Sequence, residues 1–334
     1  MTLLTLHGIV PPHRGNTLAP KELALSEITI VVPVKNNQEG VTRLLEACIK
    51  VFAQNRYPAE ILLVDNLSHP PVEVPAHLAS DLPVRILICA QPGTAAARNL
   101  GAMQAQTQWI LFLDSDCIPT PGFIDGYRQA MNGAIAYAGM VRAERSDLVS
   151  RYYDAENILN PPSLWDKGRK RPAYLITANA LVWREALAMI GGLDERFPSA
   201  GGEDVDLGFR LWSVGPLAYA PAAHILHAFE PDLRAFVRRF VRYGRGNRLL
   251  AARYQAKLEP HLFAVRFSSP MNWLLSSVQF FSFWWGYYTT RPARNWSMPL
   301  PIPPWSKSTF ETFPAQVEQS LQQISSDIAT HQLT

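Results

Sequence analysis

The stretch Trp109-Ile110-Leu111-Phe112-Leu113-Asp114-Ser115-Asp116 places two carboxylates directly after a run of five apolar residues. A continuous apolar run of this length predicts a buried strand, as in a parallel sheet. Pro119 and the pair Pro121-Gly122 follow, and both residue types interrupt regular structure, so the aspartates are expected in a tight turn. Ligands of open α/β sheets bind at the carboxyl ends of the strands, which makes this turn the candidate site.

Asp114 and Asp116 are two residues apart, and side chains with this spacing in an extended chain point the same way. Both carboxylates could therefore face one cation, and hard divalent ions such as Mg²⁺ and Mn²⁺ prefer oxygen ligands. Aspartate is also common in turns that bind nothing, because its side chain bonds its own backbone. The triplet alone is therefore compatible with a metal site and with a solvated turn.

The composition is that of a globular protein, with 48% hydrophobic and 18% charged residues among 334. This length allows one large α/β domain or a domain with an extension. The net charge of +3 gives no indication of a nucleic-acid partner. The three cysteines, Cys48, Cys89 and Cys117, are far apart and form no CxxC pair, which is typical of structural cysteines in a reducing compartment. The N-terminus has no signal-peptide pattern, so we expect a cytoplasmic location.

Alternating strands and helices are predicted for residues 28–113. The expected strands are 28–34, 61–64, 84–88 and 109–113, and the expected helices are 41–52 and 95–106, the second with Thr94 as its N-cap. Strand, helix and strand in succession predict a right-handed parallel unit, and hence a Rossmann-like layer. The sequence has no GxGxxG after the first strand and no GxxxxGK[ST], which argues against dinucleotide and Walker-type sites.

Polar side chains follow three of the predicted strands. They are Lys35-Asn36-Asn37, Asp65-Asn66 and Asp114-Ser115-Asp116. Each group could be an ordinary turn, but the carboxyl ends of parallel strands meet at one edge of the sheet. Their coincidence favours a single site at that edge.

The second half of the chain is less regular. Residues 134–141 and 175–183 have strand character, 146–160 suggest a polar helix, and 161–173 form a basic, proline-containing loop. The pair Gly201-Gly202 precedes Glu203, Asp204 and Asp206, which are expected in the first turn of a helix over 203–212. Acidic residues are favoured at a helix N-terminus by its dipole, so their presence there does not require a function.

Six motifs, taken in order, resemble the inverting glycosyltransferases of family 2, which have the GT-A fold. The motifs are the first strand with Pro33 and Asn36, then Leu63-Val64-Asp65-Asn66-x-Ser68, Gly93-x-x-x-Ala97-Arg98-Asn99-x-Gly101, Phe112-Leu113-Asp114-Ser115-Asp116, Gly191-Gly192-Leu193-Asp194-Glu195-x-Phe197 and Glu203-Asp204-x-Asp206-Leu207-x-x-Arg210-Leu211. The resemblance covers about residues 27–250. It implies an α/β fold, a mixed GT-A (Rossmann-like) sheet flanked by helices, with a C-terminal amphipathic and aromatic helical extension.

The resemblance also implies roles for individual residues. The implied donor contacts are Pro33, Asn36, Asp65, Arg98 and Asp114. The implied ligands of Mn²⁺ or Mg²⁺ are Asp116, Asp114 and His227, with His224 a less well-spaced alternative. Asp204 matches the general base, and Glu203 is the fallback. Two structural alternatives stay open: Asp65 could be a buried partner of Arg98, and His227 could be a core histidine with satisfied hydrogen bonds.

The implied reaction is the metal-assisted transfer of one sugar from a UDP- or GDP-sugar to an acceptor hydroxyl, with inversion. The acceptor would be a lipid-linked saccharide or another surface-glycan precursor. Processive members of the family carry a Q-x-x-R-W motif, which is absent here. The alternatives are a sugar-nucleotide pyrophosphorylase-like nucleotidyltransferase and a non-catalytic membrane scaffold.

Two C-terminal segments have features of helices that contact a membrane. Residues 233–248 place arginines along one face of a predicted amphipathic helix, which suggests a membrane surface, phosphate binding by Arg245 or Arg248, or a solvated face. Residues 271–288 are uncharged and rich in aromatics. We expect an interfacial helix there, with a single span or a capping or dimer contact as alternatives. The expected division is an arm (1–26), a GT-A domain (27–250) and a membrane-associating extension with a tail (251–334), at the inner face of the cell membrane.

Overall fold

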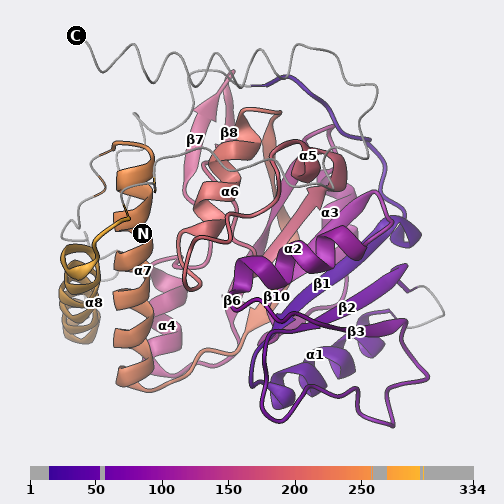
Figure 1. Cartoon of the computed structure of the whole chain (residues 1–334), viewed down its shortest axis with the longest axis horizontal. Coiled ribbons are helices and arrows are strands. Elements are labelled where there is room, and N and C mark those ends of the chain that lie inside the picture. The colour runs from indigo at the N-terminus through magenta and orange to yellow at the C-terminus, as the bar shows by residue number, and fades with distance from the viewer. Residues whose placement is uncertain (1–14, 53–56, 257, 259–268, 294–295, 297–334) are drawn as a thin grey trace.

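The computed structural model describes residues 15–52, 57–256, 258, 269–293 and 296. Its main element is an eight-stranded mixed sheet with the strand order β3-β2-β1-β4-β9-β6-β10-β5 (Figure 1). The strands are β1 (Ile28–Val34), β2 (Glu60–Asp65), β3 (Val84–Ile88), β4 (Trp109–Leu113), β5 (Cys117–Pro119), β6 (Ala136–Ala143), β9 (Asn179–Trp183) and β10 (Leu217–His227), and β7 (Ser163–Asp166) and β8 (Arg169–Pro172) form a separate hairpin. The helices are α1 (Gln38–Val51), α2 (Thr94–Gln104), α3 (Phe123–Ala130), α4 (Leu148–Ala155), α5 (Arg184–Met189), α6 (Glu203–Trp212), α7 (Leu233–Arg253) and α8 (Pro270–Thr289), with a 3₁₀ turn at Leu25–Glu27. The expected fold class, a mixed α/β sheet flanked by helices with helices at the C-terminal end, is confirmed.

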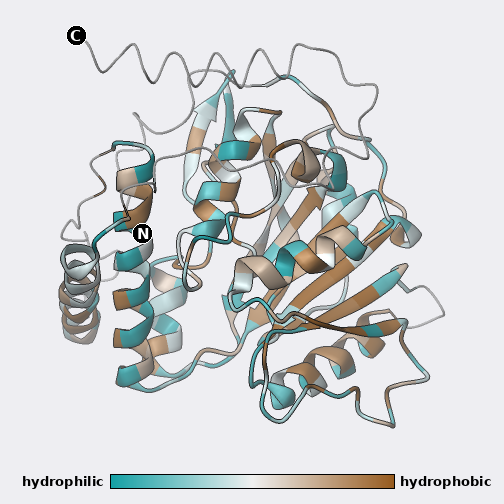
Figure 2. Cartoon of the chain, in the orientation of Figure 1, coloured by the Kyte–Doolittle hydropathy of each residue, from teal (hydrophilic) through white to brown (hydrophobic). Residues whose placement is uncertain are grey.

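The first half of the sheet is parallel, as predicted. β1 pairs in parallel with β2 and β4, and β2 pairs with β3. These strands are largely hydrophobic (Figure 2), and all five residues of β4 are buried, because helices and loops cover both faces. α2 packs on β1 and β2 through Gly101, where a Cβ atom would lie 2.4 Å from Cγ1 of Val31. The prediction that Thr94 caps α2 was wrong: the N-cap is Gly93, whose φ of +128° suits glycine, and Thr94 is the first helical residue.

The second half of the sheet is mixed. β9 runs antiparallel to β4 and β6, and β10 runs parallel to β6. Only Asn179–Trp183 of the expected strand 175–183 is a strand. The expected loop 161–173 contains the hairpin β7–β8, whose turn is Lys167-Gly168 with φ of +46° and +74°. Positive φ at both turn residues matches the twist of the paired strands, which explains why this basic segment forms a hairpin.

The chain after the Asp114–Asp116 turn continues as a strand, whereas the prolines predicted an interruption. Cys117–Pro119 forms β5, which pairs antiparallel with β10 at the sheet edge, with Cys117 opposite His227. Pro119 is the last residue of β5, a position at an edge where a missing N–H costs little. This pairing brings the second half of the chain against the candidate turn.

Both ends of the described chain are packed against the sheet domain. The N-terminal arm is attached from its first described residue, since the Gly15 amide donates to the Trp212 carbonyl at 3.1 Å and Leu23 is buried. At the other end α7 lies beside α8, which is at the outer edge of the molecule (Figure 1). No helix within the described ranges has both the length and the apolar character needed to cross a membrane. The helical stretch suggested at 315–328 lies outside the described residues.

Candidate functional site

The carboxyl ends of β1 and β4 border a cleft of about 550 Å³. Five of the predicted site residues line it, namely Pro33, Asn36, Arg98, Asp114 and Asp116. Ala200 and Phe229 line it from the second half of the chain. The prediction that polar strand ends gather at one edge is therefore confirmed for β1 and β4. Asp65, at the end of β2, is not among the residues that line this cleft.

Asp65 is buried and organises the loop that follows β2. Its two carboxylate oxygens accept hydrogen bonds from the amides of Ser68 (2.8 Å) and Val72 (3.0 Å). Burial raises the pKa of Asp65, but the hydrogen bonds from Ser68 and Val72 prevail and lower it below its usual value. The alternative that Asp65 pairs with Arg98 was wrong, because Arg98 binds two other carboxylates.

Asn36 and Asn37 connect the loop after β1 to the loop after β2 and to the Asp114–Asp116 turn. Asn36 has φ of +52°, which asparagine tolerates better than most residues, and its side chain accepts a hydrogen bond from the His69 amide at 2.8 Å. The Asn37 side-chain amide donates to Oγ of Ser115 at 2.9 Å and its oxygen caps α1. The loop after β1 is thereby tied to the Asp114–Asp116 turn.

Arg98 on α2 joins the two halves of the site. Its guanidinium donates to Asp114 at 2.6 Å and to Glu203 at 3.2 Å, and only 2% of the residue is exposed. Burial alone would lower the pKa of Arg98, but the charges of Asp114 and Glu203 raise it above its ordinary value. The adjacent Asn99 bonds to Leu193 and Glu195. Helical periodicity alone could not reveal these partners, which are up to 105 residues away in the sequence.

The side chains that could hold a divalent cation gather beside the end of β4. Within the part of the chain that the structure describes, ligand atoms of Asp116, Cys117 and His227 all lie within 4.8 Å of one another. Nε2 of His227 is 3.4 Å from Asp116, while Asp114 is engaged with Arg98. Burial raises the pKa of the Cys117 thiol well above its usual value, which disfavours the thiolate that a metal requires. Asp116 and His227 are therefore the better ligands.

His227 has the properties of an available ligand. It is 2% exposed, and its Nδ1 atom is buried without a hydrogen-bond partner, so the alternative of a core histidine with satisfied hydrogen bonds is not supported. Burial lowers its pKa below the ordinary value, although Asp116 acts in the opposite direction, and a neutral imidazole is the form that binds metals. Phe229 stacks on its ring at 4.4 Å. His224, by contrast, is exposed on β10.

Glu203 and Asp204 at the start of α6 have different surroundings. Glu203 is buried, binds Arg98 and accepts a hydrogen bond from the Gly201 amide at 2.5 Å. Asp204 is half-buried and accepts only the amide of the next residue, Val205, at 2.8 Å among the described hydrogen bonds. Burial, together with the charge of Glu203, raises the pKa of Asp204 to about 7. Asp204 is therefore the carboxylate suited to exchanging a proton near neutral pH.

A buried ion-pair network, not anticipated from the sequence, holds α6 in place. Arg253, at the end of α7, binds both Asp194 and Asp206, the second at 2.9 Å, and neither aspartate is exposed. Arg210 also binds Asp206, at 2.7 Å, and Tyr254 donates to it. Asp206, like Glu203, therefore binds buried cations, whereas Asp204 makes no such ion pair among the described residues.

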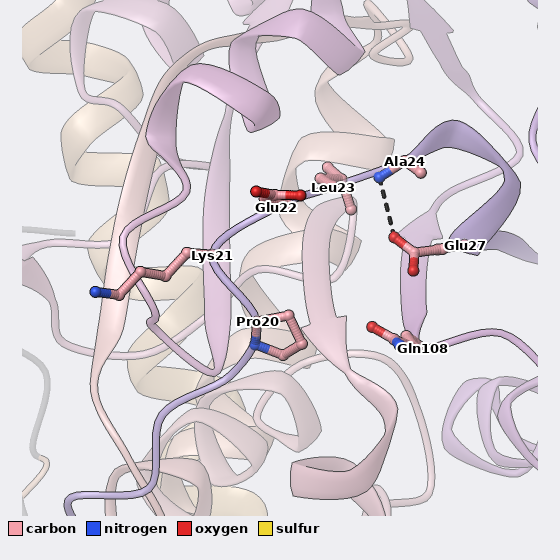
Figure 3. A pocket seen from close by; sticks show the side chains of 7 residues that line it. All are labelled: Pro20, Lys21, Glu22, Leu23, Ala24, Glu27 and Gln108. Carbon is pink, nitrogen blue, oxygen red and sulfur yellow. Dashed lines mark hydrogen bonds between the residues drawn. The ribbon is translucent and has the colours of Figure 1, made fainter.

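A second cavity lies at the opposite edge of the sheet, beside the residues that precede β1 and β4 (Figure 3). It is lined by Pro20, Lys21, Glu22, Leu23, Ala24, Glu27 and Gln108. Glu27 accepts a hydrogen bond from the Ala24 amide, and none of the predicted site residues lines this cavity. Its lining offers no group of converging ligands, so the cleft at the carboxyl edge is the candidate site.

Comparison with known proteins bears on the same region. The family model described as "Glycosyl transferase family 2" matches residues 29–191. The pre-mycofactocin glycosyltransferase of Mycobacterium tuberculosis is 29% identical over 266 residues, which cover 75% of this chain and 53% of that protein. The chain thus spans about half the length of this relative.

Two solved structures resemble the chain weakly. GalNAc-T7, solved with UDP, GalNAc and Mn²⁺, has a TM-score of 0.49 at 16% identity, covering 83% of this chain and 58% of that one. The mannosyltransferase PcManGT from Pyrobaculum calidifontis, solved with GDP-Man and Mn²⁺, has a TM-score of 0.48 at 14% identity, covering 92% and 82%. Both TM-scores are below 0.5, and the ligands belong to those two proteins.

Proposed function

The chain belongs to glycosyltransferase family 2, and we propose that it transfers a single sugar from a nucleotide-diphosphate sugar to an acceptor hydroxyl with inversion. The observation that carries the proposal is that two carboxylates, Asp116 and Asp204, lie on different elements in different surroundings. Asp116 lies with His227 beside the cleft, while Asp204 lies on α6 and has a raised pKa. One group can hold the leaving diphosphate while the other accepts the proton of the attacking hydroxyl.

Asp204 accepts that proton. Inverting transfer needs a base on the side from which the hydroxyl attacks, and a carboxylate with a pKa near 7 removes a proton efficiently at neutral pH. Glu203, which is bound to Arg98 and the Gly201 amide, positions the start of α6. Arg98 links that position to Asp114 at the cleft. This arrangement supports Asp204, rather than the fallback Glu203, as the base.

Asp116 and His227, with Asp114, would hold Mn²⁺ or Mg²⁺. Nε2 of His227, which lies 3.4 Å from an Asp116 oxygen, and the Asp116 carboxylate fit a divalent cation. When bound, such an ion neutralises the charge that develops on the leaving nucleoside diphosphate. Pro33 and Asn36 line the same cleft and are proposed to contact the donor, a UDP- or GDP-sugar. Asp65 would support this part of the site through the loop that it organises.

The proposed acceptor is a lipid-linked saccharide or another surface-glycan precursor, and the proposed location is the cytoplasmic face of the cell membrane. The missing Q-x-x-R-W motif supports transfer of one sugar per encounter over processive synthesis. The match to family 2 favours a glycosyltransferase over a pyrophosphorylase-like nucleotidyltransferase. The retained Asp116, His227 and Asp204 favour a catalyst over a non-catalytic scaffold.

A thermal-shift screen of UDP- and GDP-sugars with and without Mn²⁺, followed by donor cleavage, tests the proposal. A ligand that binds only the native state raises the apparent Tm, and we expect this for one donor class in the presence of Mn²⁺. That donor should then be cleaved to the nucleoside diphosphate by wild-type protein and bound but not cleaved by Asp204→Asn. Full cleavage by folded Asp204→Asn would overturn Asp204 as the base. Absence of any donor binding would favour the scaffold, and synthesis of the nucleotide-sugar from a nucleoside triphosphate would favour the nucleotidyltransferase.

A further inference from the structure

We propose that α8 docks on an anionic lipid surface through an outward aromatic face. We define this face as Trp273, Leu274, Phe281, Trp284, Trp285 and Tyr288, which are between 44% and 66% exposed. Their spacing of three, four and seven residues places them on one stripe of the helix. Isolated exposed apolar residues are common on proteins, but six large ones on one stripe mark an interaction surface.

The opposite, buried face of α8 mixes small and polar residues with Leu275, Phe283 and Tyr287. Its buried residues include Ser276, Gln279, Ser282 and Gly286. Gln279 accepts a hydrogen bond from the Tyr152 hydroxyl at 2.7 Å, so the polar side is satisfied within the protein. A Cβ on Gly286 would lie 2.0 Å from the Val241 carbonyl, so α8 packs closely on α7. Helices in apolar surroundings pack in this way, with small residues between them.

The chemistry of the outward face fits the boundary between lipid headgroups and acyl chains. Four of its six residues are tryptophan or tyrosine, whose rings combine an apolar body with a polar group and are enriched at that boundary. No residue of α8 is charged. Because no described helix can span a membrane, we place α8 along the surface with only this face inserted.

Exposed arginines lie on α7, the helix that packs against α8. Arg234, Arg238 and Arg245 are exposed and follow the helical spacing of four and seven residues. Val241, which contacts α8 at Gly286, lies between Arg238 and Arg245 on the helix. The pair of Arg238 with Glu230 is about two-thirds exposed on both sides and is therefore weak. Anionic headgroups supply the opposite charge, whereas α8 of a second copy has no acidic residue to offer.

Vesicle flotation of the full-length protein tests the proposal, with phosphatidylcholine vesicles compared to mixed phosphatidylcholine–phosphatidylglycerol vesicles. We expect binding to the mixed vesicles and a loss of at least about tenfold in the double variant Trp273→Ser/Trp285→Ser, because two inserted indoles are removed. Trp165→Ser is the matched control: Trp165 is 67% exposed but lies on β7, and its replacement should leave vesicle binding unchanged.

Arginine substitution separates the electrostatic part of the binding. Arg234→Gln/Arg245→Gln should weaken binding to the anionic vesicles by about fivefold per arginine. Vesicle binding of the wild type and of this variant should both weaken at high salt. Donor binding in solution, measured by thermal shift, should be unchanged in all these variants, because none of these side chains lines the cleft. The outcome for α8 is thereby distinct from the outcome for the proposed transfer reaction.

Two results would overturn the proposal. One is that wild-type protein, with a normal melting curve, fails to float with either kind of vesicle. The other is that Trp273→Ser/Trp285→Ser changes a dimer to a monomer, as measured by light scattering, without changing flotation. The second result would assign the aromatic face to a second copy of the chain.

Discussion

Glu203 and Asp204 are adjacent in sequence, but their contacts give them different tasks. Glu203 is held by Arg98 and the Gly201 amide, whereas Asp204 has no cationic partner in direct contact among the described residues. Burial therefore acts on Asp204 with little compensation, and its pKa rises to about 7. The sequence could identify the acidic group but not this division, which depends on an arginine about a hundred residues away.

The pH dependence of transfer should report on Asp204. The base must be ionised, so kcat/KM should fall as the pH decreases through about 7 and reach a plateau above it. Asp204→Asn should lower kcat by about 10²–10⁴-fold and abolish this inflection. The profile is measured with saturating metal, and a wild-type inflection that persists in a residual Asp204→Asn activity would contradict the assignment.

The raised pKa of Asp204 also predicts how the free energy of unfolding changes with pH. The folded state binds more protons than the unfolded state between the usual aspartate pKa of 3.8 and about 7, so ionised Asp204 destabilises the fold as the pH rises through this window. Asp204→Asn should therefore have a higher free energy of unfolding than wild type at pH 8, and the difference should shrink toward pH 4. Urea unfolding at both pH values measures it. A variant that is equally destabilised at both pH values would contradict the prediction.

The two histidines of β10 provide a matched pair for testing the metal site. His227 is buried beside Asp116, and His224 is exposed. We expect His227→Gln to weaken the apparent Mn²⁺ affinity at least about tenfold, because an imidazole ligand is lost. His224→Gln should have no effect. The measurement is a Mn²⁺ titration followed by electron paramagnetic resonance, and equal effects of both substitutions would argue against His227 as a ligand.

At the scale of elements, α2 and α7 make buried ion pairs that their own sequences do not predict. Both were predicted as helices, and both are helices. Their site contacts could not be predicted, because Arg98 and Arg253 are buried cations whose acidic partners come from distant segments. The same limit applies to β5, because its three residues form a strand only through their pairing with the distant β10.

Arg253 should be important for the stability of the fold, although it does not line the cleft. Arg253→Met leaves the unexposed Asp194 and Asp206 with fewer cations, which should cost about 3 kcal/mol of the free energy of unfolding. Arg238→Met, on the same helix, removes only an exposed pair and should change stability by less than about 0.5 kcal/mol. Chemical denaturation compares the two. Similar values for both would show that the buried network contributes little.

At the scale of the whole molecule, the parallel half was predictable and the mixed half was only partly so. Strands β1, β2 and β4 are largely apolar runs, and local pattern is sufficient for such strands. In the second half the pairing joins segments far apart in sequence, as between β4 and β9. Local pattern could not predict this pairing, nor the hairpin β7–β8 with its basic residues.

Gly244 and Gly246 of α7 bear on which segments of the protein unfold together. A Cβ on Gly244 would lie 2.0 Å from the Phe283 carbonyl of α8, and a Cβ on Gly246 would lie 1.9 Å from the Gly201 carbonyl before α6. One turn of α7 therefore makes backbone contact with two other segments. In native-state hydrogen exchange, the amides of α8, the middle of α7 and the start of α6 should behave as one cooperative unit, with a common opening free energy. Independent exchange of α8 would show that the effect of its contact with α7 does not extend to α6.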